Sequence, residues 1–113
     1  MKIRKFHLYL ADLNPRMGTE PGKTKPVVVL QTDLLNNEHY STIICPVTTN
    51  VIKESSILRI HLNANECGLK KNSDILVDQI SAIDNRRFIK EIGFLSSHHQ
   101  EQLVRNIKIV LFE

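Results

Sequence analysis

Short apolar runs separated by turn-forming residues follow one another along most of this chain, and this pattern constrains its fold more than any other feature. Strands are predicted at 6–13, 27–31, 42–48, 57–62, 74–78, 79–83 and 89–95, with the fifth and sixth forming a short pair joined by a bend. Strands this short and this closely spaced predict a small, strongly bent antiparallel barrel. With 113 residues, the chain is expected to form a single domain over residues 1–113.

Three of these runs carry further information about the sheet. Residues 27–31 are apolar on both faces and β-branched, which predicts a central strand, whereas the alternation in 6–13 predicts a strand with one buried face. Pro46 has no N–H to donate to a neighbouring strand. The run 42–48 is therefore expected either to lie at an edge of the sheet or to contain a bulge.

The end of the chain has a different period. Ser96 or Ser97 can cap a helix, and Ser97 with Gln100 has the spacing of a capping box. Apolar residues then recur at helical spacing on one face: Leu103, Ile107, Val110 and Leu111. The predicted fold class is therefore mainly β, with one C-terminal amphipathic helix packed against the barrel.

Composition limits the classes of protein to which the chain can belong. Hydrophobic residues make up 42% and charged residues 24%, an ordinary balance for a globular domain, and the net charge of +3 permits a polyanionic partner without requiring one. No apolar run approaches the roughly 18–20 residues of a membrane span. Polar residues soon interrupt the basic start, so we expect no signal peptide. Cys45 and Cys67 follow no metal-binding or redox spacing and are expected to be reduced thiols of a cytoplasmic protein.

The segment 14–26, between the first two predicted strands, holds two of the four glycines and three of the four prolines. A loop of about a dozen residues in a compact domain commonly binds something. Gly18 and Gly22 would let backbone N–H groups approach a ligand closely. The segment also carries the charged residues Arg16, Glu20, Lys23 and Lys25. The alternative is a solvated connection with scattered charge, which the spacing alone does not exclude.

An ordered set of short motifs runs through nearly the whole chain. In order, they are Ala11-Asp12-Leu13-Asn14-Pro15, Gly18-Thr19-Glu20-Pro21-Gly22, Lys25-Pro26, Pro46-Val47-Thr48-Thr49, Asp78-Gln79-Ile80, Ile83-Asp84 and Arg86-Arg87. In this order and spacing, the chain resembles the MazF/PemK/Kid family of bacterial toxin ribonucleases. It departs from the family at Phe6-His7, where Gly-Asp/Glu is usual, and at Lys25, where the family usually has a catalytic Arg. Lys is a point charge without the planar fork of Arg, so this change alters the geometry of a phosphate contact but not its charge.

The resemblance implies an SH3-like β-barrel of the CcdB/Kid/MazF type and metal-independent cleavage of single-stranded RNA, with no cofactor and no metal. The ribose 2′-OH would attack the adjacent phosphorus, leaving a 2′,3′-cyclic phosphate and a 5′-OH. Such a reaction needs a base for the 2′-OH, an acid for the 5′ oxygen and donors for the charged phosphorane.

The resemblance also assigns expected roles to residues. Lys25 would be the cation at the phosphate, Thr48 would donate to a non-bridging oxygen, and Glu20 would orient Lys25 or serve as a base. The expected RNA-binding residues are Arg16, Thr19, Lys23, Thr49, Asp78, Gln79, Arg86 and Arg87. The plainer interpretation of each is structural: a solvent-facing lysine, a threonine that caps a turn, or a solvated charge pair.

The five histidines are further acid–base candidates. His98 and His99 are adjacent on the predicted helix and point about 100° apart, which disfavours shared metal binding and predicts two surface residues. His7 and His61 fall in predicted strands, where a packed or solvent-facing role is expected. His39, in a polar segment, is the one histidine that merits a test for activity.

The resemblance implies two kinds of protein partner. One is a second copy of the chain, in a homodimer, and the other is a cognate antitoxin whose extended or helical tail blocks the RNA cleft. Two other functions stay open: a non-cleaving toxin of the same fold that binds DNA gyrase, and a degenerate member that binds RNA or antitoxin without cutting. The combination of Glu20, Lys25 and Pro26 favours the ribonuclease over the gyrase-binding toxin.

Overall fold

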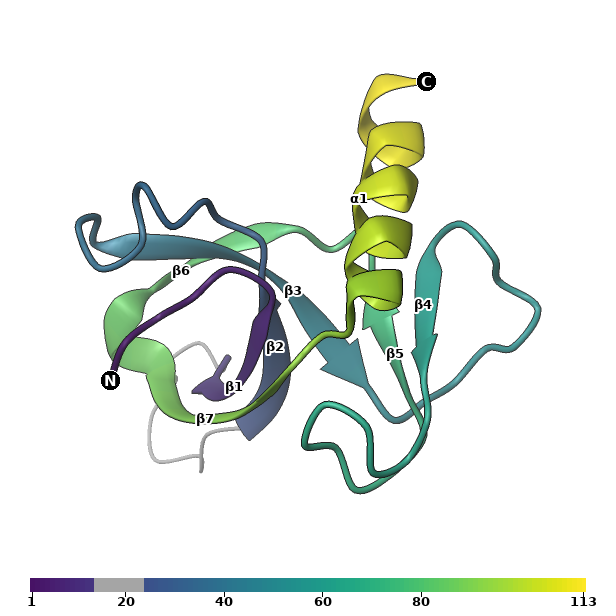
Figure 1. Ribbon diagram of the computed structural model, residues 1–113, viewed down its shortest axis with the longest axis horizontal. Coiled ribbons are helices and arrows are strands. Elements are labelled where there is room, and N and C mark those ends of the chain that lie inside the picture. Colours follow the sequence, from purple (N-terminus) through teal and green to yellow (C-terminus); the bar gives the residue numbers. More distant parts are fainter. Residues whose placement is uncertain (14–23) are drawn as a thin grey trace, which may run out of the picture.

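A computed structural model describes residues 1–13 and 24–113, and within these residues seven strands form one antiparallel sheet followed by a helix (Figure 1). The elements are β1 (His7–Asp12), β2 (Thr24–Val29), β3 (Ser41–Thr48), β4 (Arg59–Leu62), β5 (Ser73–Leu76), β6 (Ser81–Asp84), the 3-10 helix η1 (Asn85–Arg87), β7 (Phe88–Phe94) and α1 (Ser97–Phe112). Each predicted strand and the predicted helix has a counterpart. The prediction of a mainly β fold with one C-terminal helix is confirmed.

The sheet has the strand order β4-β5-β3-β2-β1-β7, and β6 also pairs with β3. It curls strongly without closing into a full barrel (Figure 1). The predicted pairing between 74–78 and 79–83 is wrong, because β5 and β6 each pair with β3 rather than with each other. A turn separates them, in which the Gln79 N–H donates to the Leu76 carbonyl at 3.2 Å.

The central strands are buried on both faces of the sheet. Leu8 and Val28 belong to the core that Leu103 of α1 covers, whereas Tyr9 and Val27 belong to a second core on the opposite face. Successive residues of a strand point to opposite faces, so two cores need apolar residues in both positions. The prediction that 27–31 is a central strand is confirmed, whereas the prediction of one buried face for 6–13 is wrong.

Pro46 lies in a central strand and not at an edge. The Ile43 carbonyl accepts from the Leu30 N–H at 2.9 Å, so the odd-numbered residues of β3 face β2 and the even-numbered ones face the other side. On that other side, the pairing with β6 ends at Ile44 and the pairing with β5 begins at Val47. Pro46 therefore occupies the gap between two partner strands, where no N–H is required.

Of the two serines predicted as possible caps of α1, Ser96 and Ser97, the structure uses Ser96. Ser96 is the N-cap, and its Oγ accepts from the His99 N–H at 3.3 Å. The Gln100 side chain donates instead to the Leu95 carbonyl, so the predicted capping box of Ser97 with Gln100 does not form. The helix start is thus fixed by one side-chain cap and by the preceding strand end.

One face of α1 packs on the sheet, as predicted, but the face is shorter than expected. Leu103 is buried, and Ile107 and Val110 pack against the same core. Leu111 is 55% exposed, so its prediction as a core residue is wrong. Asn106 is buried on this face, and its amide donates to the Ser56 carbonyl at 3.2 Å. None of the helices in the described part of the chain has the length and apolar character needed to cross a membrane.

Candidate functional site

A hollow of about 280 Å³ opens where β3 ends. Its lining residues come from β2, β3 and the segment before and into β5: Pro26, Val47, Thr48, Thr49, Leu69, Lys70, Lys71 and Ser73. We call it the lysine hollow. Lys70 and Lys71 are exposed, and neither has an ion-pair partner among the described residues. Two uncompensated cations beside threonine hydroxyls suit a phosphate group.

Lys25 lies near the start of β2, and Thr48 is the last residue of β3. These strands pair with Val27 opposite Pro46 and Val28 opposite Cys45. The same register, continued to the end of β3, sets Lys25 across from Thr48, and facing residues of antiparallel strands direct their side chains to one face. Lys25 is exposed and is not among the described residues that line the lysine hollow, whereas its neighbour Pro26 is.

The Thr48 side chain is partly committed to the local backbone. Its Oγ1 accepts from the Asn50 N–H at 3.1 Å, which fixes the turn after β3. The hydroxyl proton is not used by this bond, so Thr48 still has a hydrogen to donate to a ligand. The structural and the ligand-binding interpretations of this residue are therefore compatible.

A buried carboxylate supports the strand end from beneath. Asp74 lies opposite Thr48 across the β3–β5 pairing and is 0% exposed. Its oxygens bond to the Arg59 guanidinium at 3.1 Å, to the His61 ring at 2.6 Å and to the Ile52 N–H at 2.9 Å. A buried carboxylate with this many partners has a structural role, and it lies next to two residues that line the lysine hollow, Ser73 along the chain and Thr48 across the strands.

A second hollow lies beside the end of β1. Its described lining residues are Asp12, Asp84, Arg86, Arg87 and Ile89. We call it the arginine hollow. Arg87 donates through Nη1 to the Asp12 carbonyl at 3.0 Å, and Asp12 lies opposite Thr24 at the start of β2. Since β2 lies between β1 and β3, Lys25 stands between strands that end at the two hollows.

The Arg86 side chain is engaged by its own neighbour. Its Nε and Nη2 donate to the two oxygens of Asp84, each at 3.0 Å, and its backbone N–H donates to Asp84 at 2.8 Å. The side-chain hydrogen bond from Arg86 is the main cause that lowers the pKa of Asp84 to about 2. This forked pair leaves Arg86 less able to bind phosphate than Lys70 or Lys71 is.

The other predicted site residues fall elsewhere. Asp78 and Gln79 are exposed in the turn between β5 and β6 and line neither hollow. Four predicted residues lie outside the described part of the chain: Arg16, Thr19, Glu20 and Lys23. The predicted constellation is thus represented here by Lys25, Thr48 and Thr49 at one place and by Arg86 and Arg87 at another. The prediction missed Lys70 and Lys71, whose only sequence signal is an adjacent basic pair between two strands.

Three of the histidines behave as predicted and one does not. His61 has a structural role, with its two ring nitrogens on Asp74 and on the Ser55 carbonyl, and His7 bonds to Glu91. His98 is exposed. The prediction that His99 is a surface residue is wrong, because its side chain is only 15% exposed and faces Glu66. His39 is exposed and lines neither hollow among the described residues.

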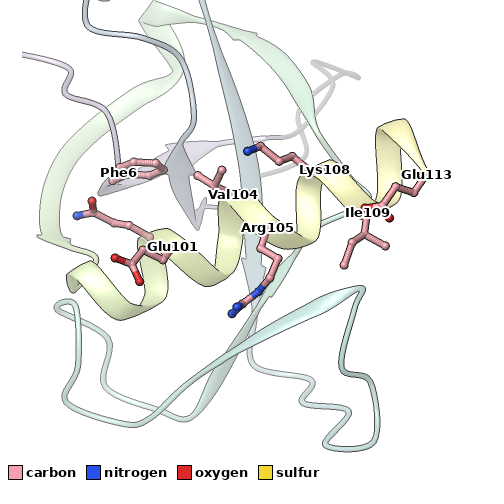
Figure 2. A pocket seen from close by; sticks show the side chains of 8 residues that line it. Phe6, Glu101, Val104, Arg105, Lys108, Ile109 and Glu113 are labelled. Atoms are coloured by element: carbon pink, nitrogen blue, oxygen red, sulfur yellow. The ribbon is translucent and has the colours of Figure 1, made fainter.

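A larger hollow of about 650 Å³ runs along the outer side of α1 (Figure 2). It is lined by Phe6, Gln100, Glu101, Val104, Arg105, Lys108, Ile109 and Glu113. Its charged residues carry both signs, and it contains none of the predicted site residues. We therefore place the candidate site at the ends of β2 and β3 rather than on the helix.

Comparisons with known proteins identify the family. Residues 4–111 match the family of PemK-like, MazF-like toxins of type II toxin–antitoxin systems. Endoribonuclease EndoA of Bacillus subtilis is 29% identical over 111 residues, covering 98% of this chain and 96% of that protein.

Solved structures of such toxins share the fold. MazF of Deinococcus radiodurans superposes with a TM-score of 0.79 at 20% identity, covering all of this chain and 99% of that one. The Mycobacterium tuberculosis toxin MazF-mt6 superposes with a TM-score of 0.76 at 20% identity, covering 91% of this chain and 93% of that one. These matches confirm the resemblance noted in the sequence, and since the family match extends over nearly the whole length, the chain belongs to the PemK-like, MazF-like toxins of type II toxin–antitoxin systems.

Proposed function

We propose that this toxin is an endoribonuclease that cuts single-stranded RNA without a metal ion. The observation that carries the proposal is the register of β2 and β3, which, continued two residues beyond the pair Val27–Pro46, brings Lys25 toward Thr48; Thr48 itself lines the lysine hollow with the exposed Lys70 and Lys71. A similar protein, EndoA, is named an endoribonuclease. The arrangement supplies a cation and a hydroxyl donor at one point, with further positive charge along the path of a polyanion.

The reaction is an internal transfer at phosphorus. The ribose 2′ oxygen forms a bond to phosphorus as the bond from phosphorus to the 5′ oxygen breaks. The 2′-OH proton goes to a base, and another proton arrives on the departing 5′ oxygen, so the products are a 2′,3′-cyclic phosphate and a 5′-OH. In this proposal the Lys25 ammonium and the Thr48 hydroxyl stabilise the non-bridging oxygens of the phosphorane, and Glu20 orients Lys25 or takes the proton.

The RNA strand would cross the ends of β2 and β3. Lys70 and Lys71 would hold phosphates next to the one that is cut, and Arg87 would add positive charge on the β1 side. The other residues proposed to contact RNA are Arg16, Thr19, Lys23, Thr49, Asp78, Gln79 and Arg86. The aromatic fraction is only 5%, so base recognition is proposed to depend on hydrogen bonds to unstacked bases more than on stacking.

The proposal includes two protein partners. A mycobacterial endoribonuclease of similar fold has been solved in complex with its cognate antitoxin, and MazF of Deinococcus radiodurans has been solved in complex with MazE. We propose a cognate antitoxin for this chain, bound so that it blocks the RNA path. We also propose a homodimer, supported by the apolar side chains that β7 and α1 leave exposed, among them Phe94 and Phe112.

Cleavage in the presence of a chelator tests the function. Purified, tag-free protein in EDTA should cut single-stranded RNA, spare DNA of the same sequence and leave 5′-OH ends. Thr48→Ala should lower the cleavage rate by about a hundredfold, the typical cost of removing a donor to a developing oxyanion. Lys90→Ala removes an exposed strand lysine on the far side of β1 and should leave the rate unchanged.

Two outcomes would redirect the proposal. Inactivity on diverse RNA together with tight antitoxin binding would indicate a degenerate toxin, the function that Lys25 in place of Arg keeps open. DNA breaks that depend on gyrase would indicate the gyrase-binding function. Lys25→Arg then separates the two chemical roles of this position: a faster rate shows that the site favours a forked cation, and a slower rate shows that it needs a titratable amine.

A further inference from the structure

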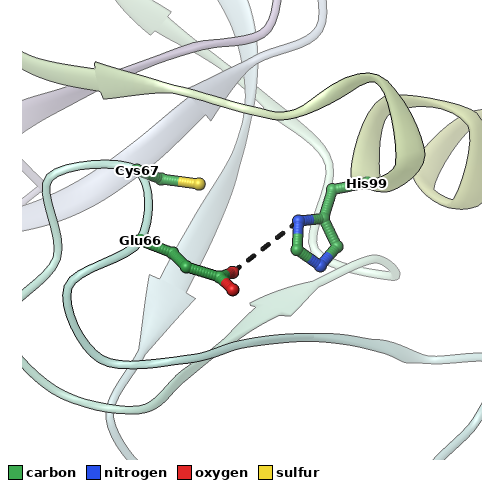
Figure 3. A group of neighbouring side chains, drawn as sticks. All are labelled: Glu66, Cys67 and His99. Carbon is green, nitrogen blue, oxygen red and sulfur yellow. Dashed lines mark ion pairs between the residues drawn. The ribbon is translucent and has the colours of Figure 1, made fainter.

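Three side chains with metal-ligating atoms converge beside the first turn of α1 (Figure 3). Glu66 and Cys67 come from the loop between β4 and β5, and His99 comes from α1. One ligand atom of each lies within 4.8 Å of the ligand atoms of the other two. Because His99 is 32 residues away from the adjacent pair Glu66-Cys67, the spacing of cysteines and histidines along the chain does not reveal this group.

The Glu66 carboxylate has an unused oxygen within this group. Its Oε2 atom is shielded from solvent and has no hydrogen-bond partner among the described residues. The nearest complementary atom that it faces is Nδ1 of His99 at 3.9 Å, which is too long for a hydrogen bond. The buried Asp74 carboxylate differs, because both of its oxygens are bonded. The Glu66 Oε2 atom therefore makes an ion pair with the His99 ring but no hydrogen bond among the described residues, which leaves it able to accept a further ligand.

The backbone holds the Cys67 thiol in this position. Cys67 and Gly68 have φ angles of 56° and 81°, in the left-handed region. A Cβ atom added at Gly68 would lie 1.7 Å from the Ile92 carbonyl oxygen, and one added at Gly93 would lie 2.1 Å from the Cys67 carbonyl oxygen. The loop and β7 therefore touch backbone to backbone, which only glycine permits on both sides. This contact fixes the loop against β7 at the residue that presents the thiol.

We propose that Glu66, Cys67 and His99 form a binding site for Zn²⁺. A thiolate, an imidazole and a carboxylate are the ligand types that zinc takes, and three protein ligands leave a fourth position for water. Zinc bonds of about 2.0–2.3 Å place tetrahedral ligands roughly 3–4 Å apart, so ligand atoms that now lie up to 4.8 Å apart must draw together by about 1–2 Å. To bind zinc, Nδ1 of His99 must carry no proton and must give up its 3.2 Å hydrogen bond with the Ser96 hydroxyl, so Nε2 is the protonated nitrogen. The thiol proton of Cys67 is released to solvent as the S–Zn bond forms.

Proton release makes binding depend on pH. Burial raises the pKa of the Cys67 thiol, the Glu66 charge raises it further, and a hydrogen bond with the Ser96 backbone opposes them. The titratable groups that face the thiol are Glu66 on its own loop and His99 on α1; the facing part of β7, Ile92 and Gly93, has none. Without metal the thiol is protonated at neutral pH, so zinc must displace a proton, and the affinity should increase as the pH rises.

Metal binding would act on the candidate RNA site through one loop. The loop between β4 and β5 carries Glu66 and Cys67 and, a few residues later, Lys70 and Lys71 of the lysine hollow. Zinc would tie this loop to α1 and reduce its motion. This consequence rests on the proposed function, whereas the metal site itself does not. Zinc is assigned no part in the cleavage chemistry.

Binding is tested with the metal alone. Tag-free protein, stripped with EDTA and then freed of it, should bind one Zn²⁺ per chain in a competition with a chromogenic chelator. Co²⁺ in place of zinc should give the near-ultraviolet absorption of a sulfur-to-cobalt charge transfer. Hydrogen exchange at residues 63–72 should slow when zinc is added. A stripped protein that binds no zinc, or a cobalt complex without the sulfur band, would overturn the proposal.

Variants identify the ligands. Cys67→Ser and His99→Ala should each weaken zinc binding by at least about tenfold to a hundredfold, since losing even an indirect support of a ligand has that cost. His98→Ala is the matched control, because His98 is the exposed neighbour on the same helix turn, and it should bind like the wild type. Equal affinity of Cys67→Ser and wild type would contradict the site. Failure to cut RNA would overturn the proposed function and leave this test unaffected.

Discussion

The two hollows differ in whether a carboxylate is paired with their cations. An aspartate lies beside each end of β3: Asp74 lies opposite Thr48, which lines the lysine hollow, and Asp84 lies opposite Ser41 and itself lines the arginine hollow. Asp74 is buried and takes its partners from within the fold. Asp84 is at the surface and accepts two hydrogen bonds from the Arg86 side chain.

This difference indicates where a polyanion should bind. At the lysine hollow, the negative charge is buried and paired, so the lysines above it are uncompensated. At the arginine hollow, Arg86 already has a carboxylate, and a phosphate would have to replace it. A count of basic residues would rank the two places alike, whereas the pattern of pairing favours the lysine hollow.

The largest expected effect is the loss of the buried carboxylate. Asp74→Ala leaves the Arg59 guanidinium and the His61 ring without their partner, and we expect it to lower the free energy of unfolding by about 3–5 kcal/mol. Urea unfolding followed by circular dichroism measures this change. Asp84→Ala, which removes the exposed acid, should unfold close to the wild type. Equal destabilisation by both variants would break the distinction between the two ends of β3.

A smaller effect is expected from the exposed lysines. The double variant Lys70→Ala with Lys71→Ala should bind single-stranded RNA roughly tenfold more weakly at low salt, and its log–log salt slope should fall by about 1.4, or 0.7 for each lost phosphate contact. Fluorescence anisotropy at several salt concentrations measures both quantities. Lys90→Ala is the control for the loss of one positive charge outside the lysine hollow. An unchanged slope in the double variant would show that RNA does not use the lysine hollow.

The smallest effect is expected at the arginine hollow. The pKa of Asp84 is lowered to about 2, so any stability that the pair provides is present above the ordinary carboxyl pKa of 3.8 and is lost as the pH falls toward 2. The pair is solvent-exposed, so Asp84→Asn should leave the melting temperature near that of the wild type at pH 7. The same variant releases Arg86, and RNA affinity should rise slightly. A fall in affinity would show that Asp84 itself supports the RNA site.

The sequence predicted the strands and the helix because their periodicity is local. It misjudged burial where the answer depended on a distant segment: the second core behind Tyr9 and the end of α1 at Leu111 were not legible from neighbouring residues. Pro46 shows the same limit. Its missing N–H was noticed, but only the switch between two partner strands explains why a central strand accepts it.

In the candidate site, too, some residues were predicted from the sequence and others are recognised only from the fold. Lys25 and Thr48 could be proposed from ordered motifs, and the strand register adds that they lie opposite each other. Lys70 and Lys71 were missed because a surface lysine pair is common and only the fold places it beside Thr48. Cys67 and His99 were dismissed as ligands because spacing along the chain cannot show a contact that depends on Gly68 packing against β7.

The most direct test of the account is the single-turnover rate of RNA cleavage in EDTA by Lys25→Ala. We expect this variant to keep the circular dichroism spectrum and melting temperature of the wild type and to cut at least about a hundredfold more slowly. A folded Lys25→Ala protein that cuts RNA at the wild-type rate would contradict the central claim that this ammonium group acts at the phosphate.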